Sequence, residues 1–243
     1  MGEERTAHFI SGGGTTAAAI FEACKRGGGL DGLVRPSLVI ASRSDIRGPE
    51  RLLATGVIQK KDIIVLRPRD FGSETLFGEA LIQACEPRDI TLFVQNGWAV
   101  KTPENFIQRF PRGTNQHPCL LSPGNPDFGG PKMLGRVCHL ARLLFVRLTN
   151  RAFFTRAVAQ RVHPQYDKGA ILRQQDVEIL PGDDVDTLAA RLLPVEHHVQ
   201  IEVLRDFALA QVVEIPAEEI VRPHEMLQWR LACEVAKLAY PKG

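Results

Sequence analysis

Short apolar runs alternate with helix-forming stretches along the first half of the chain. Strands are predicted where the runs are four to six residues long and rich in β-branched or aromatic residues, at residues 6–10, 36–41, 62–66 and 90–94. Helices are predicted between them, at residues 17–25, 48–54 and 74–85. In the last of these, Leu76, Ala80 and Ala84 recur at helical spacing. This alternation predicts an α/β fold with a doubly wound, mostly parallel, Rossmann-like sheet and helices on both faces.

The second half is less regular. After a loop rich in Pro and Gly, a basic helix is predicted from Met133 to Leu148, and its arginines are expected to form a solvated face. Further elements are predicted as strands at 153–162 and 170–179, a helix at 184–206, an edge strand at 211–215 and a helix at 223–240. We expect a main domain over residues 1–210. Residues 211–243 would add a strand and a helix packed on the same domain.

Composition and charge argue against several classes of function. A net charge of +2, with 44% hydrophobic and 24% charged residues, is ordinary for a globular protein and argues against nucleic-acid binding through bulk charge. The five cysteines are widely spread and form no C-x-x-C pair, which favours free thiols in a reducing cytoplasm over disulfides or a zinc site. No apolar run resembles a signal peptide or a membrane span.

A glycine-rich loop follows the first predicted strand. Gly12, Gly13 and Gly14 precede Thr15 and Thr16 at the start of a predicted helix, and this arrangement aims backbone N–H groups and the positive helix end at an anion. The alternative is a plain tight turn between strand and helix.

The same loop also fits a loose dinucleotide fingerprint through Gly12, Gly14 and Ala17. The acid expected after the second strand is missing from it, although Arg43 stands there and could face a 2′-phosphate.

A second polar stretch comes where a later strand would end. Alternation puts Asn115 and His117 on the same side of that strand, and Pro118 ends the ladder because it has no N–H. We expect this stretch, the glycine loop and the loop of Gly97 and Trp98 to lie at the carboxyl edge of the sheet, where ligands bind in such folds. Trp98 suits either an aromatic ligand or the core.

Four segments, taken together and in order, resemble the folate-dependent formyltransferases over roughly residues 6–207. They are FISGGGTTAAAIFEACK at 9–25, TNQHPCLLSP at 114–123, YDKGAILRQQDVEI at 166–179 and DTLAARLLPVEHHV at 186–199. The resemblance is greatest to the branch that formylates glycinamide ribonucleotide in purine synthesis. It implies the formyltransferase fold, an enzyme that takes 10-formyltetrahydrofolate as co-substrate, and no metal.

The resemblance also implies roles for particular residues. The catalytic residues would be Asn115, His117 and Asp167, the substrate-binding residues Gly14, Thr15, Thr16 and Glu196, and the folate-binding residues Gly97, Trp98, Ala99 and Val100. The chemistry agrees, because a tetrahedral intermediate carries an oxyanion that an amide and a protonated imidazole can stabilise, and a carboxylate can hold that imidazole. The expected partners are small-molecule substrates, without nucleic acid or membrane, and a homodimer is left open.

Departures from the family pattern leave the acceptor open. Cys119 replaces a serine of the signature, the segment from Pro123 to Phe153 is longer and more basic, and Leu193 stands where a polar residue is usual. One alternative is a formyltransferase acting on an amino sugar or another amine. The other is an NADP-binding Rossmann oxidoreductase that uses Gly12, Gly14 and Arg43.

Overall fold

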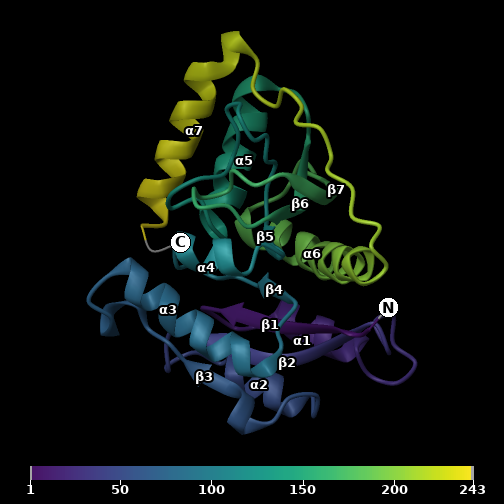
Figure 1. Ribbon diagram of the computed structural model, residues 1–243. Helices are drawn as coiled ribbons and strands as arrows, with labels where there is room; N and C mark the ends of the chain where they lie inside the picture. The colour runs from purple at the N-terminus through teal and green to yellow at the C-terminus, as the bar shows by residue number, and fades with distance from the viewer. Residues whose placement is uncertain (1, 242–243) are drawn as a thin grey trace. The chain divides into compact units, whose positions relative to one another are not determined.

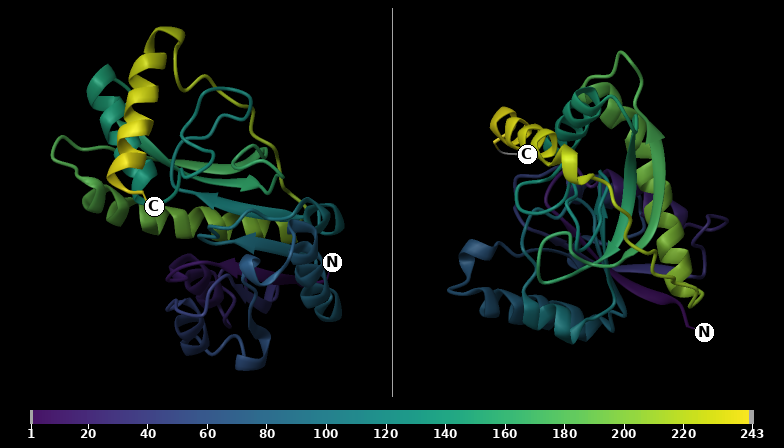
Figure 2. Two further views of the ribbon diagram at one scale, coloured as in Figure 1. Left: turned by 90° about the vertical axis from the view of Figure 1, so that its left-hand side faces the viewer. Right: turned by 90° about the horizontal axis from the view of Figure 1, so that it is seen from above.

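The computed structural model describes residues 2–241 and divides the chain into two compact units. Unit 1 is the part up to Asn115 together with Gln200–Val213, and unit 2 is Gln116–Val199 together with the part from Glu214 onward. Figures 1 and 2 show the elements of each unit.

The strands follow the order β3-β2-β1-β4-β5-β6-β7 in one sheet. Their bounds are β1 Glu4–Ile10, β2 Val34–Ala41, β3 Ile63–Val65, β4 Leu92–Gln95, β5 Gly113–His117, β6 Phe154–Arg161 and β7 Ile171–Glu178. The pairs that join β3, β2, β1, β4 and β5 are parallel, whereas β6 and β7 are antiparallel. The prediction of an α/β fold with a mostly parallel, doubly wound sheet is confirmed.

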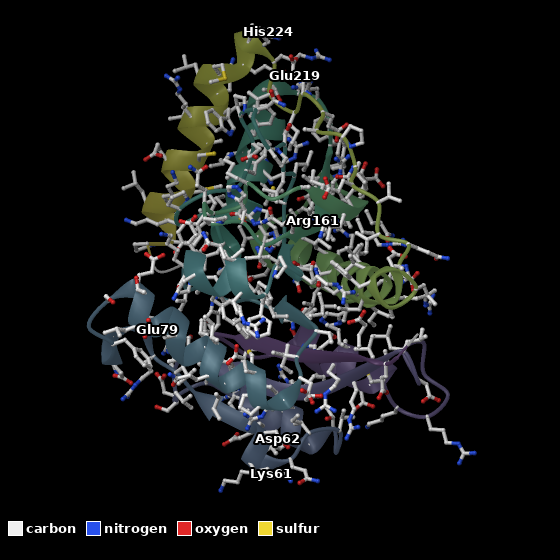
Figure 3. All side chains as sticks on the ribbon, in the orientation of Figure 1. Lys61, Asp62, Glu79, Arg161, Glu219 and His224 are labelled. Carbon is white, nitrogen blue, oxygen red and sulfur yellow. The ribbon has the colours of Figure 1, made fainter. Side chains whose placement is uncertain are left out.

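Helices of unit 1 connect its parallel strands. They are α1 Thr15–Ala23, α2 Gly48–Ala54, α3 Glu74–Cys85 and α4 Glu104–Arg109. The strand order reverses between β1 and β4, so right-handed connections put α1 and α2 on one face and α3 and α4 on the other. The first two helices contact each other, as do the last two. Figure 3 labels Lys61 and Asp62 in the short turn of 3₁₀ helix before β3.

Phenylalanines form the centre of the core between β1, β4 and α4. Phe9 lies 5.5 Å from both Phe93 and Phe106, measured between ring centroids, and all three side chains are almost completely buried. The sequence-based interpretation had not included α4. Its six residues are too few to show a helical period, and Phe106 holds it through tertiary packing.

Unit 2 contains the hairpin of β6 and β7, α5 Arg136–Thr149 and α7 Met226–Ala239. The helix α6 Val185–Ala208 begins in unit 2 and ends in unit 1. The expected edge strand at 211–215 was wrong as a strand. Only one bridge forms, in which the Ile215 N–H donates to the Ile171 carbonyl at 2.7 Å, and Pro216 directly after it has no N–H to extend a ladder.

Arg142 corrects the expectation of a solvated arginine face on α5. Its side chain is buried, its Nε donates to the Phe154 carbonyl at 2.7 Å, and its Nη2 donates to the Ala152 carbonyl at 2.5 Å. The rings of Phe128, Phe145 and Phe154 lie within 5.5 Å of the guanidinium carbon. Burial lowers the pKa of Arg142 to about 10, so the group stays charged at neutral pH.

Among the residues that the structure describes, no helix has both the length and the apolar character needed to cross a membrane.

Candidate active site

The strand β5 carries the polar pair that the sequence singled out. Asn115 and His117 occupy alternate positions of β5, and Asn115 is in parallel register with Gln95 of β4. His117 ends the strand because Pro118 follows it. The imidazole of His117 is buried in unit 2.

Both ring nitrogens of His117 face oxygen atoms. Nε2 lies 3.0 Å from the carbonyl oxygen of Phe128, and Nδ1 lies 3.6 Å from Oδ1 of Asp167. The thiol sulfur of Cys138 is 3.8 Å from Nε2. A neutral imidazole offers one N–H and one acceptor nitrogen, whereas an imidazolium offers two N–H groups. The Nε2 contact therefore has the length of a hydrogen bond, whereas the 3.6 Å between Nδ1 and Oδ1 is the separation of an ion pair, which forms when the imidazole is protonated.

Asp167 is held by donors on both carboxylate oxygens. The Gly130 N–H donates to Oδ2 at 2.9 Å, and Nε2 of Gln160 donates to Oδ1 at 2.7 Å. The backbone of Asp167 has a φ of 55°, a left-handed conformation that Asp and Asn adopt more readily than most residues. Such a conformation is uncommon, so the surrounding contacts must hold it.

Two glycines make room for this turn. A Cβ on Gly129 would lie 2.7 Å from the Cβ of Asp167. A Cβ on Gly169 would collide with the carbonyl oxygen of Arg161, which Figure 3 labels at the end of β6. The glycine of the Asp167-Lys168-Gly169 segment is therefore needed because two stretches of backbone approach closely there.

The sequence-based interpretation missed Gln160 and the backbone groups of Phe128 and Gly130. Gln160 had a detectable signal, because it is the polar residue that directly follows the apolar run Ala157-Val158-Ala159 of β6, and a buried polar side chain needs a partner. Backbone donors and acceptors carry no side-chain signal, so the sequence could not have revealed the other two.

Glu196 lies on α6 and is almost completely buried. Burial raises its pKa to about 7, against the weaker opposing effect of a hydrogen bond with Gln116. Pro194, two residues earlier, cannot donate to the carbonyl of Ala190, so the helix is locally weakened beside this carboxyl group. A carboxyl group that titrates near neutral pH is typical of functional sites.

The Glu196 carboxyl group should make stability fall as pH rises. In the unfolded chain it ionises near its ordinary pKa of 4.5, whereas the folded protein keeps the proton until about pH 7. Stability from this group is therefore lost between those two values. We expect Glu196→Gln to remove about 2–3 kcal/mol of the decline in unfolding free energy between pH 5 and pH 8. Urea denaturation at both pH values measures it, and parallel pH dependence in the two proteins would contradict the expectation.

In unit 1, the glycine loop leads into α1 as predicted. Gly14 is the N-cap of α1 with a φ of 64°, and a Cβ there would lie 3.1 Å from the Cα of Gly48. Because the N-cap residue is a glycine, it has no side chain that could accept hydrogen bonds from the N–H groups of Thr15 and Thr16 in the first turn of α1. This arrangement can bind an anion.

The loop after β4 is tied to the glycine loop through Ser11. The Ser11 N–H donates to the Gly97 carbonyl at 3.1 Å, and the Ala99 N–H donates to the Ser11 hydroxyl at 2.9 Å. The structure thus brings these two loops together at the carboxyl ends of β1 and β4, as expected. Trp98 is buried, and its ring centroid lies 5.2 Å from that of Phe9, as expected for a core residue. Val100 ends this loop, and the folate-binding role of Gly97, Trp98, Ala99 and Val100 stays a prediction.

Arg43, which could have faced a 2′-phosphate, forms an ion pair with Asp45. Its guanidinium donates to both carboxylate oxygens of Asp45, at 2.9 and 2.6 Å. This pair is exposed and therefore weak, so it does not decide the NADP alternative; the acid that the dinucleotide fingerprint expects after the second strand is still missing. Among residues 2–241, no cluster of His, Cys, Asp or Glu side chains could hold a metal ion.

Comparison with known proteins shows to which family the chain belongs. The formyl transferase family model matches residues 4–204. The chain belongs to the formyl transferase family. The matched region includes all four segments that resembled the family, and it ends before α7.

Relatives within the formyl transferase family carry consistent names. A chloroplastic phosphoribosylglycinamide formyltransferase of Arabidopsis thaliana is 28% identical, over 83% of this chain and 64% of that protein. The phosphoribosylglycinamide formyltransferase of Haemophilus influenzae is 26% identical, over 84% of this chain and 87% of that protein. The crystal structure of glycinamide ribonucleotide transformylase 1 from Symbiobacterium toebii matches with a TM-score of 0.73 at 29% identity, covering 88% of this chain and 91% of that one.

The chain spans a little less than two thirds of the chloroplastic relatives from Arabidopsis thaliana and Vigna unguiculata, at 64% and 62% of their lengths.

Proposed function

We propose that this formyl transferase family member moves the formyl group of 10-formyltetrahydrofolate to the primary amine of glycinamide ribonucleotide, a step of purine biosynthesis. The observation that carries the proposal is the buried His117 imidazole between the Phe128 carbonyl and the Asp167 carboxylate. The names of the relatives from Haemophilus influenzae and Symbiobacterium toebii support the same acceptor.

The formyl group passes directly from one substrate to the other, so the main task of the protein is to stabilise the charge that develops. The amine nitrogen attacks the formyl carbon, the bond from that carbon to folate N10 breaks, and one proton passes from the amine to N10. Between these events an oxyanion forms on the formyl oxygen, and fixed dipoles and charges stabilise it.

In the mechanism that we propose, His117 and Asn115 stabilise the oxyanion in two different ways. Both N–H groups of an imidazolium at His117 would point at protein oxygens, so His117 acts through its positive charge. The Asn115 amide then supplies the N–H that the oxyanion accepts. Asp167 holds the imidazole and stabilises its cation, and Gln160 and the Gly130 N–H fix the carboxylate.

The acceptor phosphate is assigned to the N–H groups of Gly14, Thr15 and Thr16 in this proposal. The left-handed Gly14 and the uncapped start of α1 support it. Glu196 is assigned to the ribose hydroxyls or the amine. A carboxyl group whose pKa is about 7 is partly neutral at physiological pH, so it can donate a hydrogen bond as well as accept one.

The folate co-substrate is assigned to the loop of Gly97, Trp98, Ala99 and Val100. At Gly97, where φ is 68°, nothing lies within 4 Å of the position of a Cβ, so the loop leaves open space beside its backbone. The proposed reaction takes no metal. The five free cysteines favour a reducing compartment such as the cytoplasm. We also propose a homodimer, for which a surface is argued below.

Replacing Thr15 with Asp should raise the KM for the acceptor by about tenfold or more. A carboxylate at the start of α1 repels a bound phosphate and also competes for its N–H donors. The KM for the folate should change little, and steady-state kinetics with both substrates varied will measure both constants. Thr187→Asp, also in the first turn of a helix but outside the proposed site, is the control. Equal effects on both substrates would contradict the phosphate assignment.

The proposed acceptor itself is tested by comparing substrates. Formyl transfer from 10-formyltetrahydrofolate is measured with glycinamide ribonucleotide and with an amino-sugar nucleotide as acceptors. The proposal predicts a kcat/KM that is higher for glycinamide ribonucleotide by at least about a hundredfold. The phosphates of an amino-sugar nucleotide lie further from its amine, so they cannot reach the N–H groups of Gly14, Thr15 and Thr16 while the amine is in place to react. A higher kcat/KM with the amino-sugar nucleotide would instead support the alternative of a formyltransferase that acts on an amino sugar. Turnover with neither acceptor would reject the proposed function.

A further inference from the structure

The helix α7 has an apolar stripe on its outer face. Four residues make it up, with exposed fractions of 76, 52, 39 and 81%, namely Leu227, Leu231, Val235 and Leu238. Their spacing of four, four and three residues puts them on one side of a helix, together with Arg230 and Glu234. Exposed leucines are ordinary singly, but a continuous stripe marks an interaction surface.

The orientation of α7 is fixed by its opposite face. Ala232, Cys233 and Ala236 are buried in a core cluster shared with α5. Figure 1 and both views of Figure 2 show α7 alongside α5 within unit 2. The indole N–H of Trp229 also donates to the Asp127 carbonyl at 2.8 Å. Turning the helix to bury the outer stripe would break these contacts, so the stripe stays exposed in this chain.

The two charges within the stripe indicate what covers it. If a second α7 lies antiparallel on this face, with the two-fold axis near residue 232, Arg230 lies beside Glu234 of the second copy, and this happens twice by symmetry. The same arrangement brings Leu227 close to Leu238 of the second copy. A parallel arrangement in register would instead set Arg230 beside Arg230. The pattern is therefore complementary to itself only in the antiparallel direction.

The contacts that Glu234 makes within a single chain leave its carboxylate able to pair with a second copy. In the isolated chain Glu234 pairs with Lys237 of the same helix at 2.9 Å, an exposed pair of the kind that contributes little. A carboxylate has two acceptor oxygens and can keep this contact while it accepts from a second arginine.

We propose that the outer face of α7 binds the same face of a second copy of this chain in an antiparallel pair. The stripe of four apolar residues is small beside the roughly 800 Å² per partner of standard stable interfaces. The dimer is therefore weak, with a dissociation constant of about 1–100 μM, and it is populated only at high protein concentration.

Charge exchange tests both the partner and the direction. Sedimentation velocity over a concentration series gives the dissociation constant for the unaltered chain, for Arg230→Glu and for Glu234→Arg. Each single variant puts like charges together at both symmetric positions, so each should weaken the dimer by about tenfold or more. An equimolar mixture of the two variants restores both opposite-charge pairs and should dimerise about as well as the unaltered chain. Leu76→Lys, which changes a half-exposed leucine on α3, should leave the constant unchanged.

Three outcomes would overturn the proposal. The first is an unaltered chain that stays monomeric at every concentration. The second is a dimer that neither variant weakens, because another surface then forms it. The third is weakening in both variants without recovery in the mixture, which means that the stripe meets a different surface. Circular dichroism of each variant shows whether α7 remains helical.

Discussion

Replacing Asp167 with Asn is expected to lower kcat by about a thousandfold while the protein still folds. Asn tolerates the left-handed backbone at this position and has nearly the same size. It cannot counter the charge of an imidazolium at His117, whose Nδ1 lies 3.6 Å from Oδ1 of Asp167. The amide also has one acceptor oxygen for two donors, from Gly130 and Gln160, which should cost about 1–3 kcal/mol of stability.

Steady-state kinetics and urea denaturation of the same preparation separate the two effects. Asp183→Asn is the matched control, because Asp183 is also buried and also accepts hydrogen bonds, from the Leu180 N–H and from Arg191. The control should lose stability and keep its kcat. If Asp167→Asn behaved like the control, Asp167 would have a structural role only.

The second large effect is expected for His117→Ala. The imidazole acts on charge that appears only in the transition state, so kcat should fall by about a hundredfold to a thousandfold while the dissociation constant of the folate changes little. The variant leaves the Phe128 carbonyl without its partner in a buried place, and some loss of stability is expected as well. Rapid kinetics and equilibrium folate titration measure the two quantities.

His139→Ala provides the comparison for His117. His139 is a buried imidazole on α5, and burial lowers its pKa to about 4, so it stays neutral at physiological pH. Its removal creates a similar cavity without removing a charge and should leave kcat within about threefold. A weaker folate complex with an unchanged rate in His117→Ala would make His117 a binding residue.

The sequence predicted the parts of this molecule that depend on local pattern. Strand alternation at Asn115 and His117, the glycine loop before α1 and the succession of strands and helices in the first half of the chain all have short-range signals. Such signals depend on neighbouring residues alone, and they nominated Asn115, His117 and the glycine loop. Asp167 and Glu196 were nominated only by the resemblance to the formyltransferases.

Other features could not be predicted because they depend on contacts that are distant in sequence. Arg142 looks like one of several surface arginines, and only the carbonyls of Ala152 and Phe154 and the rings around it make its burial favourable. The support of Asp167 by Gln160 and the Gly130 N–H likewise depends on how β6 and the loop before α5 meet. The folding of a charged group into the core is visible only in three dimensions.

Arg142 also bears on the order in which unit 2 is assembled. Its guanidinium reaches carbonyls only 10 and 12 residues further along the chain, so the loop that it closes is short and costs little entropy. The charge is expensive to desolvate until both carbonyls are in place. We therefore expect the end of α5, the left-handed turn at Asn150 and the start of β6 to form in one cooperative step, early in folding.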